Sequence, residues 1–289
     1  MAVACVVRAI HGMGLEVAPH KSEALFLRRG KRNHMHGAPP DAAYVVVDGT
    51  SVRVGTQLKY LGLYLDNTWS FNGHFQRLAP RVEAVVHSLS RLLPNLGGPD
   101  GKVRRLYAMT VRAVALYGSP VWAGALMASR RGKMLLRRIF RRVVIRVIRG
   151  YRTVSHTAAS VLAGLPPIEL YALMHTEVYR RTKELGGLGV VLIPRVRAAV
   201  RLQARRRMLE RWLEDLSNPR DNSRARVVEA VRPRLIKWAE RAGGEMSYRM
   251  AQVFLRAMDV LALTCAVSVA KWTRAATTAG RTRTRRNTL

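Results

Sequence analysis

Arginine is the residue type whose number and spacing in this sequence most clearly predict chemistry. Between Asp100 and Glu169 there is no acidic residue, whereas 14 lysines and arginines fall in the same interval. If residues 134–149 form a helix, arginines recur along it every three or four positions and therefore share one side. A planar guanidinium binds a phosphate through two parallel hydrogen bonds, and a surface of one sign is unlike an ordinary solvated face. We predict that seven arginines contact a nucleic-acid backbone: Arg137, Arg138, Arg141, Arg142, Arg146, Arg149 and Arg152.

The charge of the whole chain favours the same class of partner. Lysine and arginine number 50 against 18 acidic residues, which gives a formal net charge of +32 over 289 residues. Self-repulsion of that size calls for a polyanion, either a nucleic acid or an anionic membrane surface. The basic residues recur along the chain instead of flanking one apolar segment, which favours RNA, DNA or an RNA–DNA hybrid.

The apolar segments and cysteines give little support to a membrane or secreted protein. The stretch Ala257–Ala270 is shorter than the roughly 20 residues that span a bilayer, and it contains Asp259. The two cysteines, Cys5 and Cys265, form no disulfide framework. We therefore expect no membrane association and an intracellular, reducing location, either nuclear or cytoplasmic.

The acidic residues and histidines predict no catalytic or metal centre. Two-metal phosphoryl chemistry needs carboxylates close together, and the sequence has seven scattered aspartates and no Asp-Asp pair. His20, His34 and His36 lie in or near a loop rich in glycine and proline, without the carboxylate or thiolate ligands of a closed metal site. We expect no catalytic residue, metal or cofactor in this chain.

Hydrophobic patterning predicts an α+β fold that is predominantly α. Asp48-Gly49 between two β-branched runs predicts a hairpin over 44–54, and Leu58–Leu65 is expected to form a further strand. Leu15–Ala18 and Ala24–Leu27 are shorter strand candidates.

From Phe71 onward the apolar spacing becomes three and four, which predicts helices. Glycine and proline separate them into the segments 74–93, 101–117, 121–149, 151–164, 167–185, 196–216 and 224–241. The expected organisation is a β-containing unit at 1–70, a helical unit at 71–256 and a divergent basic tail at 257–289, which we expect to be disordered at its end.

Six segments in order resemble the C-terminal part of the reverse transcriptase of non-LTR (LINE-type) retrotransposons, most closely the elements that insert into ribosomal RNA genes. The segments are GLEVAPHKSEALFL (14–27), KYLGLYLD (59–66), HFQRLAPRVEAVVHSLSRLLPNLGG (74–98), LYGSPVWA (116–123), YRTVSHTAASVLAGLPPIEL (151–170) and GEMSYRMAQV (244–253). Each is loose alone, and the resemblance covers about 14–253, which is most of the chain.

The resemblance implies a role for each part of the chain. Residues 14–27 match the end of the polymerase palm, and Lys21 matches a lysine near the incoming nucleotide. Tyr60, Leu61 and Gly62 match the primer grip, and the helices after them match the thumb and connector. In such an enzyme the metal-binding aspartates would lie just upstream of Met1, so that Mg²⁺ is expected only in the intact parent enzyme, and a separate upstream palm and fingers segment is a possible partner. Beyond Val253 the family's histidine segment and metal knuckle are not matched.

Simpler interpretations exist for each of these residues. Lys21 fits the cap of a turn equally well, and one of Tyr60 and Leu61 is expected in the core because they alternate along a strand. Gly62 fits a position of close packing.

The first hypothesis is a fragment of an RNA-directed DNA polymerase that binds primer and hybrid but is inactive alone. The alternatives are a repurposed non-catalytic nucleic-acid-binding protein and a protein that binds anionic membranes through 134–149 and the tail.

Overall fold

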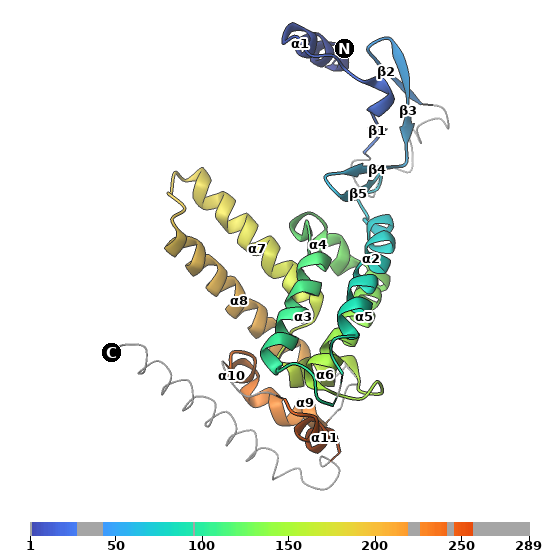
Figure 1. Ribbon diagram of the computed structural model, residues 1–289. Helices are drawn as coiled ribbons and strands as arrows, with labels where there is room; N and C mark the ends of the chain where they lie inside the picture. The colour runs from blue at the N-terminus through green and yellow to red at the C-terminus, as the bar shows by residue number, and fades with distance from the viewer. Residues whose placement is uncertain (1, 28–42, 95, 219–225, 242–245, 257–289) are drawn as a thin grey trace. The chain divides into compact units, whose positions relative to one another are not determined.

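The computed structural model describes residues 2–27, 43–94, 96–218, 226–241 and 246–256, and these are mostly helical with a small β region (Figure 1). This agrees with the predicted α+β, predominantly α class. The chain divides into two units, Met1–Arg77 and Leu78–Leu289. The predicted tail 257–289 lies outside the described residues.

The first unit contains one helix before its strands. Its elements are α1 (Ala2–Gly12), β1 (Ala24–Leu25), β2 (Tyr44–Val47), β3 (Thr50–Gly55), β4 (Gln57–Tyr60) and β5 (Leu63–Asp66). In the sheet β1-β3-β2, β1 runs parallel to β3 and β2 runs antiparallel to it, with Val45 opposite Val52. The hairpin predicted around Asp48-Gly49 is confirmed, and both turn residues have the positive φ that a two-residue hairpin turn requires.

The prediction of one strand over Leu58–Leu65 is wrong, because this segment is a second hairpin. Strands β4 and β5 pair antiparallel, and the chain reverses at Leu61 and Gly62. The φ angles of these residues are 46° and 82°, so the turn uses two left-handed residues. Tyr60 and Leu61 are 59% and 73% exposed, which also overturns the expectation that one of them is in the core.

The segment Leu15–Ala18 is not a strand either. It leads without regular structure into a short 3₁₀ turn over Pro19–Lys21, where proline fixes the φ angle of the first residue. The second strand candidate, Ala24–Leu27, is confirmed only over the two residues of β1.

A turn at Asp66 connects the second hairpin to α2 (Asn72–Ser90). One carboxylate oxygen accepts from the backbone N–H and hydroxyl of Thr68 and from the N–H of Ser70 at 2.7–3.1 Å. Burial raises the pKa of Asp66, but the hydrogen bonds from Ser70 and Thr68 outweigh burial and hold it below its usual value. The Asp66 carboxylate therefore takes the place of water as the acceptor for the donors of Thr68 and Ser70 in the turn before α2.

The second unit is built from helices that pack against one another (Figure 1). After α2 they are α3 (Gly101–Ala115), α4 (Ser119–Ala128), α5 (Arg130–Ile148), α6 (His156–Ala163), α7 (Ile168–Gly187), α8 (Pro194–Ser217), α9 (Arg226–Val231), α10 (Leu235–Ala239) and α11 (Tyr248–Arg256). The helix considered over 134–149 is found as part of α5, and its apolar side is buried, with Leu136, Ile139, Phe140, Val143 and Val147. Asp100, Ser129 and Ser155 cap α3, α5 and α6 by accepting the backbone N–H three positions beyond the cap.

An arginine that the sequence offers as part of the basic surface is instead in the core. Arg104 has no exposed area, and its guanidinium donates to four backbone carbonyls. The acceptors are Pro94, Gly97, Pro99 and Arg146, at 2.5–3.1 Å. These bonds join the α2–α3 loop to the C-terminal end of α5, and they offset the cost of desolvating the cation.

Candidate nucleic-acid interface

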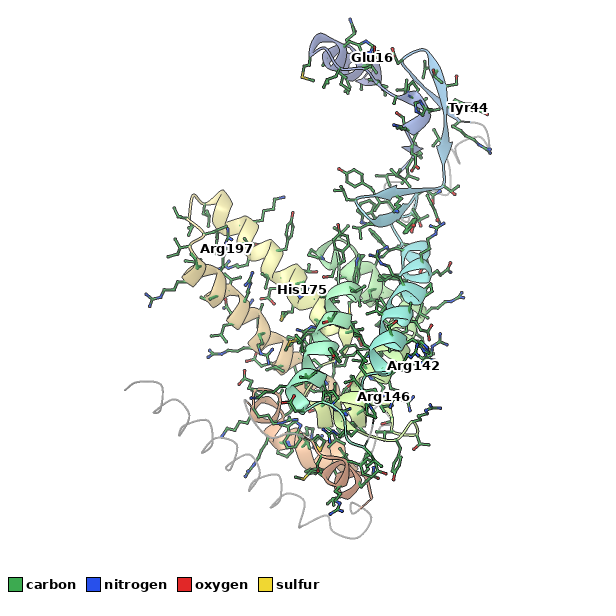
Figure 2. The ribbon with its side chains drawn as sticks, in the orientation of Figure 1. Glu16, Tyr44, Arg142, Arg146, His175 and Arg197 are labelled. Carbon is green, nitrogen blue, oxygen red and sulfur yellow. The ribbon has the colours of Figure 1, made fainter. Side chains whose placement is uncertain are left out.

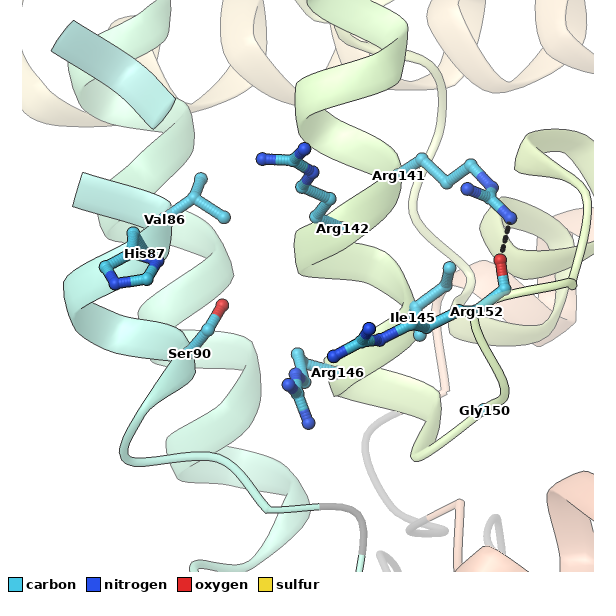
Figure 3. Close-up of a pocket in the computed structure, with 9 residues that line it drawn as sticks. All are labelled: Val86, His87, Ser90, Arg141, Arg142, Ile145, Arg146, Gly150 and Arg152. Atoms are coloured by element: carbon cyan, nitrogen blue, oxygen red, sulfur yellow. Dashed lines mark hydrogen bonds between the residues drawn. The ribbon is translucent and has the colours of Figure 1, made fainter. Parts of the chain in front are cut away.

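A pocket of about 500 Å³ lies between the C-terminal half of α2 and the C-terminal half of α5 (Figure 3). Its lining residues are Val86, His87, Ser90, Arg141, Arg142, Ile145, Arg146, Gly150 and Arg152. Four of the nine are arginines and none is acidic. We call this the arginine pocket.

Three guanidinium groups reach from the α5 side of the arginine pocket toward α2. Figure 3 shows Arg142, Arg146 and Arg152 directed this way, with His87 and Ser90 on the facing wall. Positions 142 and 146 share a face because they are four residues apart on α5. Arg152 follows the end of that helix, where Arg149 takes the left-handed conformation that turns the chain back.

Two arginines of the arginine pocket also contact other residues of the helical unit. Arg142 forms an ion pair with Glu83 of α2, and Arg146 donates to the carbonyl of Leu93 at 3.3 Å. A guanidinium has five N–H donors in a planar fork. The ion pair with Glu83 uses one nitrogen of the Arg142 fork.

The other predicted backbone contacts have different surroundings. Arg141 turns away from α2 and donates to the carbonyls of Arg152 and Val154, which holds the segment after α5 in place (Figure 3). Arg149 donates to the carbonyl of Pro99 at 3.2 Å. Arg138 is exposed, with no ion pair among the residues that the structure describes.

Arg137 is held by a buried carboxylate. Its Nε donates to Glu169 at 2.5 Å, and the same glutamate forms an ion pair with its terminal nitrogen. The side chain of Glu169 is almost fully buried, in the first turn of α7, where the helix dipole favours negative charge. The acid-free interval therefore does not leave these arginines without carboxylate partners, because Glu83 and Glu169 lie outside that interval in the sequence.

A nearby histidine is sensitive to the positive field of α5. Burial lowers the pKa of the His156 imidazole to about 4, and the charges of Arg137 and Arg141 act in the same direction. The imidazole is therefore neutral at physiological pH and adds no positive charge to this region.

This arrangement is suited to holding phosphate oxygens. Fixed N–H donors in a concave, water-accessible site favour anions, and a cation would find no carboxylate among the lining residues. Among the described residues no group of three or more His, Cys, Asp or Glu side chains could hold a metal ion. By length and composition no single described helix could cross a membrane, and α6 with α7 passes that test only as a pair bent by 56°.

The site residues expected in the first unit occupy turns. Lys21 ends the 3₁₀ turn, where its backbone N–H donates to the carbonyl of Ala18 at 3.0 Å. Tyr60, Leu61 and Gly62 form the exposed end of the second hairpin. Their nucleotide and primer roles stay predictions.

Sequence reasoning missed the α2 wall of the arginine pocket. Glu83, His87 and Ser90 lie four and three residues apart, so they share one side of α2. That polar stripe was visible in the sequence, but its partner on α5 lies 59 residues away and has no local signature.

Comparisons with known proteins give matches to insect retrotransposon proteins. A 115 kDa protein in type-1 retrotransposable element R1DM of Drosophila melanogaster is 30% identical over 150 residues, which is 50% of this chain and 14% of that protein. The retrovirus-related Pol polyprotein from type-1 retrotransposable element R1 4 of Nasonia vitripennis is 23% identical over 198 residues, 63% of this chain and 50% of that protein.

The corresponding Pol polyprotein from R1 of Bradysia coprophila is 30% identical over 127 residues, 44% of this chain and 12% of that protein. The chain thus spans half or less of the length of these relatives. No family model matches the chain, and no solved structure matches it.

Proposed function

Because the homologues of this chain are proteins of R1 non-LTR retrotransposons, we propose that it is a nucleic-acid-binding segment of a reverse transcriptase from such an element. Its helical unit corresponds to the thumb and connector and binds the sugar–phosphate backbone of an RNA–DNA hybrid. The observation that carries this proposal is the convergence of Arg142, Arg146 and Arg152 on one pocket.

The proposal includes a division of labour within the whole polyprotein. Polymerisation needs paired carboxylates that hold Mg²⁺, and the seven aspartates of this sequence are scattered. The catalytic cations would therefore be held by another part of the protein, and this segment would supply affinity for primer and hybrid without chemistry of its own.

Binding of this kind depends steeply on salt. For B-form duplex DNA the slope of log K against log salt is about −0.9 for each phosphate contacted, because each contact releases a condensed counterion. We expect the full chain to retain an RNA–DNA hybrid at low salt and to release it as KCl is raised, as measured by fluorescence anisotropy with labelled hybrid.

The decisive variant removes the three converging guanidinium groups together. Arg142→Gln, Arg146→Gln and Arg152→Gln in one chain should reduce the size of the salt slope by about 2 to 3 if each arginine contacts one phosphate. A matched control, Arg232→Gln with Arg234→Gln and Lys237→Gln, removes the same charge from an exposed part of η2 (Arg232–Arg234) and α10.

The control should change the slope by less than half as much. If both triple variants lower it equally, the binding depends only on net charge, and the assignment to the arginine pocket is wrong. A binding constant that does not vary with salt would contradict nucleic-acid binding altogether.

The absence of polymerase activity is tested separately. Purified chain with primed RNA template, deoxynucleotides and Mg²⁺ should extend no primer. DNA synthesis that co-purifies with the chain and follows its concentration would show that the catalytic part of the proposal is wrong.

The second candidate is a non-catalytic nucleic-acid-binding protein that uses the helical unit alone. The observation in its favour is a core specific to that unit, with Trp122, Trp212 and Trp238 fully buried in it. If this candidate is correct, the isolated chain should unfold in one cooperative thermal transition. It should also bind hybrid without any other polyprotein segment.

A further inference from the structure

Helices α7 and α8 form an antiparallel hairpin that extends away from the rest of the second unit (Figure 1). The fully buried residues of α7 all lie in its first five positions, Ile168–Ala172. Those of α8 begin at Val200, and the residues before it are exposed or half-buried. The free end of the hairpin therefore covers no part of the core.

The loop at this free end exposes aliphatic side chains. Leu188 is 78% exposed and Val191 is 76% exposed, and Val190 and Ile193 are also exposed. We call these four residues the apolar tip. Pro194 follows directly as the first residue of α8.

Backbone hydrogen bonds fix the shape of the apolar tip. The N–H of Val190 donates to the carbonyl of Leu185 at 3.0 Å, and Gly189 takes a left-handed conformation with φ 73°. This is the pattern of a helix end closed by a glycine. The aliphatic side chains are thus presented on an ordered turn, at the cost of exposure to water.

Basic residues flank the apolar tip on both helices. They are Arg180, Arg181 and Lys183 on α7 and Arg195, Arg197 and Arg201 on α8, all exposed. Glu184 is the one acidic residue between positions 179 and 201, and it pairs with Arg180 and Arg181. Figure 2 shows Arg197 near the free end of α8.

The size of the apolar tip argues against a protein as its main partner. A stable protein interface buries roughly 1,200–2,000 Å² in total, and four aliphatic side chains supply a small part of that. A few apolar side chains are enough, however, to enter between two base pairs, and flanking arginines can then bind the phosphates on either side.

We propose that the apolar tip of the α7–α8 hairpin inserts at the end of a duplex, where hybrid meets single strand, and unstacks the terminal base pair. This rests on the proposed function, because it names how the same nucleic acid is engaged at a second place. The charge complementarity of Lys183, Arg195, Arg197 and Arg201 with phosphates supports the assignment; none of the four forms an ion pair within the described residues.

The test uses the full chain and an RNA–DNA hybrid with a single-stranded template overhang and 2-aminopurine at the last paired position. Unstacking raises the fluorescence of 2-aminopurine, so saturating protein should raise it several-fold. The variant Leu188→Ser with Val191→Ser should abolish most of that rise. It should also weaken binding to the junction by about tenfold, which corresponds to about 1.4 kcal/mol.

A matched control is Leu202→Ser, which changes an exposed aliphatic residue of α8 outside the apolar tip. It should leave the fluorescence rise and the junction affinity unchanged. Both substitutions alter exposed residues, and circular dichroism should confirm that helix content is kept.

Three outcomes would separate the two proposals. If the hybrid is bound at low salt but no fluorescence rises, insertion is wrong while the proposed function stands. If nothing binds, both are wrong. If the tip variant instead loses co-sedimentation with nuclease-treated anionic vesicles and keeps junction binding, the apolar tip binds lipid and insertion is wrong.

Discussion

Arginines in the core of the helical unit and arginines in the arginine pocket have the same side chain but opposite environments. Arg104 is buried and donates to four backbone carbonyls, whereas Arg142 and Arg152 are exposed at the edge of a pocket. Arg104 depends on the carbonyl acceptors that the fold supplies. Arg142 and Arg152 have N–H donors that can bind a ligand from outside the protein. Arginine density in a sequence therefore does not by itself measure the size of a phosphate-binding surface.

Arg241 and Arg105 are half-buried and also donate to backbone carbonyls. Arg241 donates to the carbonyls of Trp238 and Leu162, and its guanidinium lies over the Trp238 ring. Burial, with the charge of Arg105 nearby, lowers the pKa of Arg241 to about 9. Arg105 itself donates to the carbonyl of Ala163 at 2.9 Å. These cations are fixed at helix ends, where carbonyls lack helical partners.

The largest effect is expected from removing the most buried cation. Arg104→Met should lower the free energy of unfolding by about 3–5 kcal/mol, because four carbonyls lose a charged donor in a site closed to water. Urea denaturation of the full chain measures this. The substitution Arg138→Met, at an exposed position, should change it by less than about 0.5 kcal/mol. If Arg104→Met and Arg138→Met lower the free energy of unfolding equally, the buried and exposed arginines do not differ in their contribution to stability.

The pH dependence of stability should reveal the pKa of His156, which burial lowers most and the charges of Arg137 and Arg141 on α5 lower further. The pKa of folded His156 is about 4, below the ordinary value of 6.5, so the unfolded chain binds more protons between those values. Stability should therefore fall as pH is lowered from about 6.5 toward 4, by at most about 3 kcal/mol from this residue.

The comparison for that experiment is His156→Gln, measured at pH 7 and pH 5. The variant should lose less stability than the native chain between the two values. His175, whose pKa burial also lowers, contributes in the same direction in both proteins. If both proteins lose the same stability between pH 7 and pH 5, the pKa of His156 is not lowered in the folded chain.

An intermediate effect is expected where an exposed arginine meets a buried carboxylate. Glu169→Gln keeps the shape but removes the charge that Arg137 faces, and should lower the free energy of unfolding by about 1–3 kcal/mol. Arg137→Gln should cost a similar amount, and the double variant less than the sum, because both changes break one ion pair. Strict additivity in this double-mutant cycle would contradict the pairing.

The smallest effect is expected for Arg138, an exposed arginine of α5. Arg138→Gln should leave stability unchanged and reduce the size of the salt slope of hybrid binding by about 0.9 or less, the value for one phosphate contact. Anisotropy titrations at several KCl concentrations measure this. If Arg138→Gln reduces the salt slope more than Arg152→Gln does, the main phosphate contact lies at Arg138 and not in the arginine pocket.

Periodicity predicted the parts of the fold that depend on local pattern. The apolar side of α5 and the hairpin at Asp48-Gly49 follow from spacing and turn chemistry alone. The turn at Leu61-Gly62 was missed because leucine rarely takes a left-handed conformation, so nothing in its type signals a turn.

The arginine pocket was predicted only on one side. The spacing of Arg142 and Arg146 shows that they share a face, but the facing wall comes from α2, far away in the sequence. The burial of Arg104 was missed for a related reason. Its acceptors are backbone carbonyls, which every residue has, so the sequence carries no mark of the partnership.

The extended shape of the α7–α8 hairpin has a consequence for local motion. Its free end has few buried side chains, so its backbone amides should open without unfolding the core and should exchange with deuterium before those of α5. Amides near the loop that bind only to neighbouring carbonyls, such as that of Val190, should be among the earliest. The free end of this hairpin, which covers no part of the core, is then also a place that can adapt its shape when something binds there.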